Sequence, residues 1–177
     1  MSRVLVAVAS KHGATREIAD AVADELRGGG HDVDCVRAQD ADIAGGYDAI
    51  VLGSAVYMKR WRRPARRLLS HLRDDLAGRP LWLFSSGPCG SDPDPSWSEP
   101  PNVVEQAERL DAIDHVVFGG RLPPEPGNFV ERAMVAKASP EERDLRDWDE
   151  IRTWAAGIGT YLGLGAPADR RTPVTTS

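Results

Sequence analysis

The chain has 177 residues, of which 41% are hydrophobic and 28% charged, and its formal net charge at pH 7 is −5. This length suits one domain with one hydrophobic core, and the acidic balance excludes nucleic acid as an obvious partner. No segment has the ~20 consecutive apolar residues that a membrane-spanning helix needs. Cys35 and Cys89 have no CxxC or other metal-ligand spacing, which predicts reduced thiols in a cytoplasmic protein and neither a disulfide framework nor a metal site.

Five short segments dominated by apolar residues predict buried strands, and helical patterns separate them. In chain order the predicted strands cover residues 4–8, 32–36, 49–52, 81–84 and 115–118. The predicted helices follow residue 15, open at Pro64, span residues 103–110 and 129–138, and begin again after Asp147, which caps the last helix with Glu150 three positions on. This alternation predicts an α/β fold with a parallel sheet and helices on both of its faces. We predict one domain over residues 1–165 and a disordered tail over residues 166–177.

Three segments of unusual composition follow directly on predicted strands, at residues 10–15, 54–61 and 85–90. In a parallel sheet the carboxyl ends of neighbouring strands meet at one edge, so we expect these segments to lie together. The first segment has the hydroxyls of Ser10 and Thr15, and Gly13 lets the backbone approach a ligand closely. With the unpaired amides and the dipole of the following helix it predicts an anion site, although a plain turn capped by a hydroxyl fits the same residues.

The residues around this loop resemble a known family. Flavodoxins have an FMN-phosphate signature that is similar to VLVAVASKHGATREIADAVADEL, with its Ser10-x-x-Gly13-x-Thr15. The flavodoxin-domain subgroup that contains menaquinone-dependent protoporphyrinogen IX dehydrogenase has segments similar to GSAVYMKRWRRPARRLL, LFSSGP and RDWDEI. This likeness is scattered over roughly residues 3–162. It implies a flavodoxin-like three-layer sandwich with a five-stranded parallel sheet, and FMN as the cofactor.

The resemblance also implies which residues hold the FMN. The first segment would bind the phosphate and the other two would line the isoalloxazine, with Tyr57 placed to stack on the ring and Trp61 packing the helix start. His12 fits a phosphate donor and a surface histidine equally well. The flavin supplies the redox chemistry, so no side chain is predicted to act as a catalytic acid or base. The implied cofactor-binding residues are Ser10, Lys11, His12, Gly13, Ala14, Thr15, Ser54, Ala55, Val56, Tyr57, Ser86, Gly87, Pro88, Cys89 and Gly90.

A run of basic residues interrupts the acidic chain. Residues 59–67 (KRWRRPARR) hold six basic side chains and no acid, namely Lys59, Arg60, Arg62, Arg63, Arg66 and Arg67. Such a run is usually a solvated helix face. Because like charges without interspersed acids repel one another, we predict instead a positive field at the mouth of the flavin site. Its targets would be the propionates of a porphyrinogen, an acidic redox partner or an anionic membrane surface.

The predicted function is that of an FMN-binding oxidoreductase or electron-transfer protein, and quinone-linked oxidation of protoporphyrinogen IX is the specific activity that the resemblance implies. The alternatives are a flavodoxin-type carrier for a protein partner, without a substrate of its own, and a domain of this fold without flavin. Residues 54–60 contain no glycine, which predicts two-electron chemistry because a backbone flip to positive φ beside the flavin is costly there. We expect a cytoplasmic protein and leave open a peripheral contact at the inner face of the membrane.

Overall fold

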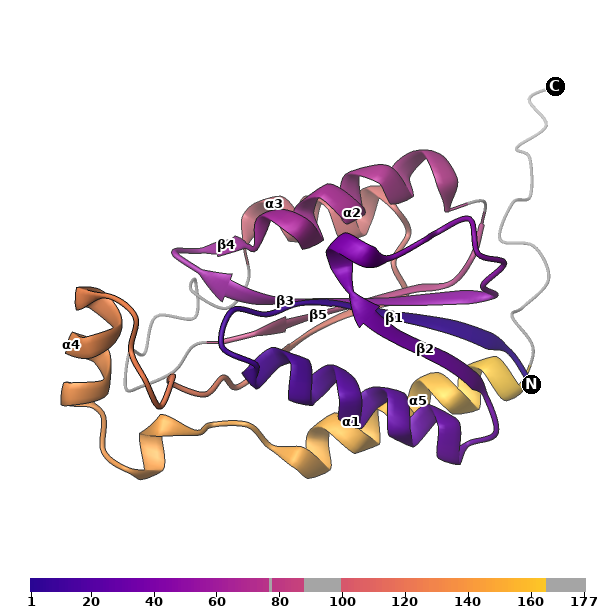
Figure 1. The fold of residues 1–177 in the computed structure, drawn as a ribbon. Coiled ribbons are helices and arrows are strands. Elements are labelled where there is room, and N and C mark those ends of the chain that lie inside the picture. Colours follow the sequence, from indigo (N-terminus) through magenta and orange to yellow (C-terminus); the bar gives the residue numbers. More distant parts are fainter. Residues whose placement is uncertain (77, 88–99, 165–177) are drawn as a thin grey trace, which may run out of the picture.

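The computed structural model describes residues 1–76, 78–87 and 100–164, and it has a central sheet between two layers of helices (Figure 1). Five parallel strands have the order β2-β1-β3-β5-β6, and a short sixth strand, β4 (Arg60–Trp61), pairs antiparallel with the end of β3. The parallel strands are β1 (Arg3–Ala9), β2 (Asp32–Arg37), β3 (Ala49–Tyr57), β5 (Leu81–Ser86) and β6 (Asp114–Phe118). The predicted flavodoxin-like α/β sandwich is therefore confirmed, with β4 as an addition. The predictions for Pro88, Cys89, Gly90 and the tail at 166–177 lie outside the described residues.

Helices cover both faces of the sheet. On one face lie α1 (Ala14–Gly28) and α5 (Trp148–Gly163), and on the other α2 (Arg63–Asp75) and α3 (Pro101–Arg109) (Figure 1). Strand β1 contributes to both cores, because Val4, Val6 and Val8 pack toward α1 and α5 whereas Leu5, Ala7 and Ala9 pack toward α2 and α3. Side chains alternate along a strand, so a strand covered on both faces needs a continuous apolar run.

One helix stands apart from these two layers. This is α4 (Phe129–Lys137), which lies beyond the tips of β3 and β4 (Figure 1). Among the described residues there are also two single turns of 3-10 helix, η1 (Ala38–Asp40) and η3 (Glu141–Arg143). The last helix starts as predicted, since Asp147 Oδ1 accepts hydrogen bonds from the amides of Asp149 and Glu150, each at 3.0 Å.

Strand β3 is longer than predicted, and the predicted end of the strand at residue 52 is wrong. The strand continues to Tyr57 because it pairs with β5 as far as Ala55 opposite Ser86 and then with β4. Met58 and Lys59 connect β3 to β4 with φ angles of 47° and 60°, the left-handed conformation typical of two-residue hairpin turns. Gly53 lies inside the strand and does not end it. A Cβ at Gly53 would come within 2.0 Å of the Phe84 ring, so packing requires glycine there.

Candidate functional site

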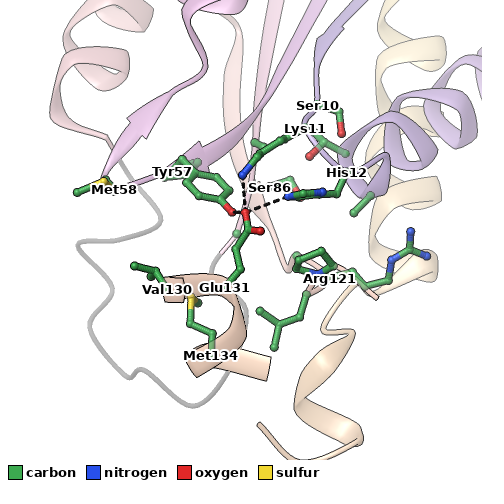
Figure 2. Close-up of a pocket in the computed structure, with 18 of the residues that line it drawn as sticks. Ser10, Lys11, His12, Tyr57, Met58, Ser86, Arg121, Val130, Glu131 and Met134 are labelled. Atoms are coloured by element: carbon green, nitrogen blue, oxygen red, sulfur yellow. Dashed lines mark hydrogen bonds and ion pairs between the residues drawn. The ribbon is translucent and has the colours of Figure 1, made fainter. Parts of the chain in front are cut away.

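A cavity of about 610 Å³ opens at the carboxyl ends of β1, β3 and β5, where α1 begins (Figure 2). Cavities that bind small molecules have volumes of roughly 300–1,000 Å³. All three segments that the sequence singled out contribute to the lining, whereas Gly13 and Ser54 do not. The predicted residues that line the cavity are Ser10, Lys11, His12, Ala14, Thr15, Ala55, Val56, Tyr57, Ser86 and Gly87.

The loop between β1 and α1 has the geometry of an anion site. The Gly13 amide donates to Ser10 Oγ at 3.1 Å, and Gly13 has a φ of 88°, in the region that favours glycine. This turn directs the chain into α1, whose first amides have no acceptor within the helix. Thr15 is buried in the first turn and lines the cavity. The amides and the positive end of the α1 dipole together favour an anion at this position.

The ends of β3, β4 and β5 are held together by buried hydroxyl groups. Ser54 Oγ accepts a hydrogen bond from the Arg62 amide at 3.0 Å, so Ser54 stabilises the β3–β4 hairpin behind the cavity. Trp61 is buried, and its Nε1 donates to Ser85 Oγ at 2.8 Å, which confirms its predicted packing role. Gly87 has a φ of 136° where the chain leaves β5 beside Val56. These contacts fix the cavity wall that two of the predicted segments form.

A buried carboxylate lies at the centre of the cavity, on a residue that the sequence analysis did not single out. Glu131 of α4 is 2% exposed, and its Oε1 accepts hydrogen bonds from Lys11 Nζ at 2.5 Å, from His12 Nε2 at 2.9 Å and from the Tyr57 hydroxyl (Figure 2). Its Oε2 accepts from the Gly127 amide at 2.7 Å. Burial raises the pKa of Glu131, but the hydrogen bonds lower it by more, so its pKa lies well below the ordinary value. We call Glu131, Lys11, His12 and Tyr57 the carboxylate cluster.

The carboxylate cluster shows which contacts two of the predicted residues, His12 and Tyr57, make. His12 is half-buried and bonds to Glu131, so it is more than a surface histidine, and its donation to a phosphate stays a prediction. The Tyr57 hydroxyl points to Glu131, and Lys11 Nζ lies 4.9 Å from the centre of the Tyr57 ring, a cation–π distance. No local pattern pointed to Glu131, because the side chains that bond to it lie 74 to 120 residues away. The other lining residues that the sequence analysis missed are Met58, Gly120, Arg121, Leu122, Pro123, Val130, Met134, Lys137 and Ala138.

An arginine outside the cavity fastens the start of α1 to the segment before α5. Arg146 is 3% exposed at its side chain, and it contacts Glu17 Oε2 and Asp144 Oδ2, each at 2.6 Å. Arg121 holds the other oxygen of Glu17 at 2.7 Å. The hydrogen bond from Arg146 is the main reason why the pKa of Glu17 is lowered, and it also lowers the pKa of Asp144. This network positions the start of α1, where Ala14 and Thr15 line the cavity.

The basic run begins at the hairpin whose Met58 lines the cavity, and it continues into α2. Lys59 and the arginines at 60, 63, 66 and 67 are exposed, and Arg62 is half-buried. Within the described part of the chain, the five arginines of the run form no ion pair. Arginines at a helix N-terminus oppose the helix dipole, which costs stability. The run therefore forms a cationic surface that begins beside the cavity.

Other chemistry is sparse in the residues that the structure describes. Their helices do not combine the length and apolar character needed to cross a membrane. Among the same residues, His, Cys, Asp and Glu side chains nowhere gather in threes as they would around a metal ion. The Cys35 thiol donates to Asp20 Oδ1 at 3.4 Å, and burial raises its pKa to about 12, so it stays protonated at neutral pH.

The protein is an α/β sandwich with a ligand-sized cavity at the carboxyl edge of its parallel sheet. A family model described as flavodoxin domain matches residues 5–149, and the chain belongs to this family. The predicted family is therefore confirmed, whereas the likeness to the protoporphyrinogen dehydrogenase subgroup stays a prediction. A search of curated proteins finds no match.

Solved structures with the same fold include two flavodoxins of similar length. One is a flavodoxin from the domain Archaea, with 15% identity and a TM-score of 0.61 over 91% of this chain and 99% of that chain. Another is the Streptococcus pneumonia TIGR4 flavodoxin, with 20% identity and a TM-score of 0.62 over 92% and 99%. The rubredoxin oxygen:oxidoreductase from Desulfovibrio gigas matches over 93% of this chain and 37% of its own, with 13% identity and a TM-score of 0.64. These likenesses concern the fold.

Proposed function

We propose that this chain binds FMN in the cavity and acts as an electron-transfer flavoprotein. The observation that carries the proposal is that the N-terminus of α1 opens into a cavity formed by three strand ends. Membership of the flavodoxin domain family and the flavodoxins among the similar structures support the same cofactor. A parallel sheet binds its ligands at this edge, so fold and cavity agree.

The residues present fit the chemical groups of FMN. Lys11 and His12 already hold an anion, the carboxylate of Glu131, and the first amides of α1 add donors suited to a phosphate. Ala55 and Val56 supply an apolar surface to the cavity that suits a flavin ring. When bound, FMN would supply the redox chemistry. The chain would bind the phosphate, orient the ring and exclude water from it.

The β3–β4 hairpin supports the prediction of two-electron chemistry. Met58 and Lys59 have positive φ angles, and the pairing of Val56 with Trp61 and of Tyr57 with Arg60 holds this turn in place. A peptide flip beside the flavin would have to disturb that pairing. The hairpin therefore opposes a conformational change that depends on the redox state.

The electron partner that we propose is anionic, because the basic run lies next to the cavity. The specific candidate is protoporphyrinogen IX as reductant with a quinone as acceptor, at the inner face of the membrane. A carrier that docks an acidic redox protein is the second candidate, and the same exposed arginines favour it. Turnover of protoporphyrinogen with a menaquinone analogue separates the two, since a carrier without a substrate of its own gives none.

A visible spectrum of the purified protein, followed by titration with FMN, tests the cofactor. We expect flavin absorbance or saturable FMN binding, and Thr15→Val should weaken binding about tenfold because a hydrogen bond to a charged group is lost. Thr160→Val is the matched control, since Thr160 is exposed on α5. If the protein neither retains nor binds FMN, the proposed function is wrong and only the fold remains.

Charge reversal tests the proposed partner surface. Arg62→Glu together with Arg66→Glu should slow electron transfer with an anionic partner about tenfold at low ionic strength, without loss of FMN. Arg73→Glu with Arg152→Glu makes the same change of charge on exposed residues outside the run. Equal rates for the two double variants would exclude the run as the docking surface.

A further inference from the structure

Helix α4 has the reverse of the usual arrangement of side chains. Its one buried residue is the charged Glu131, whereas Phe129 is 81% exposed and Val130 is 64% exposed. A helix on a protein surface normally buries its apolar stripe and exposes its charges. The attachment of α4 to the rest of the protein therefore depends on a polar contact, the carboxylate cluster, and much less on apolar packing.

The carboxylate cluster connects α4 to the segments that would bind FMN. Lys11 and His12 belong to the loop before α1, and Tyr57 ends β3, so the donors of the cluster line the candidate site (Figure 2). The Glu131 side chain extends across the cavity to reach them (Figure 2). A phosphate at the same loop would need the same cationic donors. Glu131 and an anionic ligand thus compete for Lys11 and His12.

The N-terminus of α4 is capped by the residue directly before it. Asn128 caps it, accepting a hydrogen bond from the Glu131 amide at 2.9 Å, so the first turn needs no support from the rest of the protein. The segment before it, residues 122–128, contains Pro123, Pro124, Pro126 and Gly127, and Pro140 follows it closely. Lys11 and His12 hold the Glu131 carboxylate by charge-assisted hydrogen bonds that a second anion can also accept, so another anion can replace the Glu131 carboxylate.

We propose that Glu131 is an internal competitor for the anionic part of the ligand, and that α4 is a lid which this carboxylate holds closed. This inference rests on the proposed FMN site. Binding of the phosphate releases Glu131 from Lys11 and His12, and α4 opens. The affinity for a phosphorylated flavin therefore depends on how much more strongly Lys11 and His12 bind the phosphate than the Glu131 carboxylate. A flavin without phosphate gains nothing from this exchange.

Dissociation constants for FMN and for riboflavin test the competition. Glu131→Gln should bind FMN about tenfold more tightly than the wild type, because loss of the competing charge frees the charge-assisted hydrogen bonds of Lys11 and His12, with riboflavin changed by less than about twofold. Glu125→Gln is the matched control, since it makes the same change of charge on an exposed residue of the preceding loop. Equal or weaker FMN binding by Glu131→Gln overturns the inference while the FMN site stands. An equal gain for both flavins also overturns it.

Hydrogen exchange of the wild-type protein tests the lid without any substitution. Amides of residues 129–137 should exchange faster when FMN is bound than when it is absent, and those of α5 should not change. Slower exchange in α4 on FMN binding would mean that Glu131 closes over the ligand, which contradicts the inference. If neither the wild type nor Glu131→Gln binds FMN or riboflavin, the proposed function and this inference both fail.

Discussion

Substitution of Gly13 by alanine should destabilise the protein, whereas the same substitution at Gly157 should stabilise it. Gly13 has a φ of 88°, whereas Gly157 lies in the middle of α5, and at neither position would an added Cβ meet another atom within 4 Å. Substitution of each by alanine therefore tests backbone conformation without a steric clash. Both added methyl groups are compatible with the packing, so the expected effects come from the backbone conformations of the folded and unfolded chain.

The two substitutions should change the free energy of unfolding in opposite directions. A left-handed backbone costs an L-residue about 1–2 kcal/mol, and the stiffer unfolded chain returns about 0.4–1 kcal/mol, so Gly13→Ala should destabilise by about 1 kcal/mol. Inside a helix alanine is favoured over glycine by about 0.8–1 kcal/mol, so Gly157→Ala should stabilise by that amount. The variants should therefore differ by about 2 kcal/mol.

Urea denaturation followed by circular dichroism measures both effects, and the slope with denaturant should stay constant. Gly13→Ala should also weaken FMN binding, because the turn at Gly13 aims the first amides of α1 at the cavity. Gly157→Ala should leave FMN binding unchanged. Stabilisation by both substitutions would refute the left-handed turn, and unchanged FMN affinity in Gly13→Ala would refute its role in the site.

Three further predictions concern charged and thiol groups. Arg146→Met should lower the free energy of unfolding by about 2 kcal/mol in urea titrations, since Glu17 and Asp144 lose a buried guanidinium, and a loss below about 0.5 kcal/mol would contradict the network. The pKa of Glu131 is lower in the folded protein than in the unfolded chain. The contribution of Glu131 to the free energy of unfolding is therefore complete above about pH 4.3, and it is lost as the pH falls through the folded pKa. The stability difference between wild type and Glu131→Gln should therefore shrink in acid, and a difference that stays constant from pH 7 to the acid limit of folding would contradict this. Burial and a pKa of about 12 should keep Cys35 unreactive toward Ellman's reagent at pH 8 in a Cys89→Ser variant until urea unfolds it, and rapid native labelling would contradict that assignment.

The sheet was predictable because its strands are covered on both faces. Continuous apolar runs such as residues 4–8 and 81–84 leave few alternatives to buried strands. The extent of β3 was not predictable, because Gly53 looks like a strand end in the sequence. Glycine is needed at position 53 because the Phe84 ring fills the space that a Cβ would take, and Phe84 lies 31 residues further along the chain. Pairing with β5 and β4 then extends the strand through residues that have weak preferences of their own.

The candidate site also has a part that the sequence predicted and a part that it did not. The loop at residues 10–15 follows a strand and starts a helix, so local sequence was enough to place it at the cavity. Glu131 gave no such signal, since a single glutamate on a short helix is ordinarily a solvated charge. Its burial results from donors at Lys11, His12 and Tyr57, which only the folded chain brings together.

An amide NMR titration tests most directly whether the start of α1 binds the phosphate of FMN. In a ¹⁵N-labelled sample, FMN should shift the amide resonances of residues 11–15 far more than riboflavin does. All of these resonances should reach saturation at the same FMN concentration. Amides of residues 11–15 that stay in place while the flavin binds elsewhere, or that respond equally to both flavins, would contradict the account.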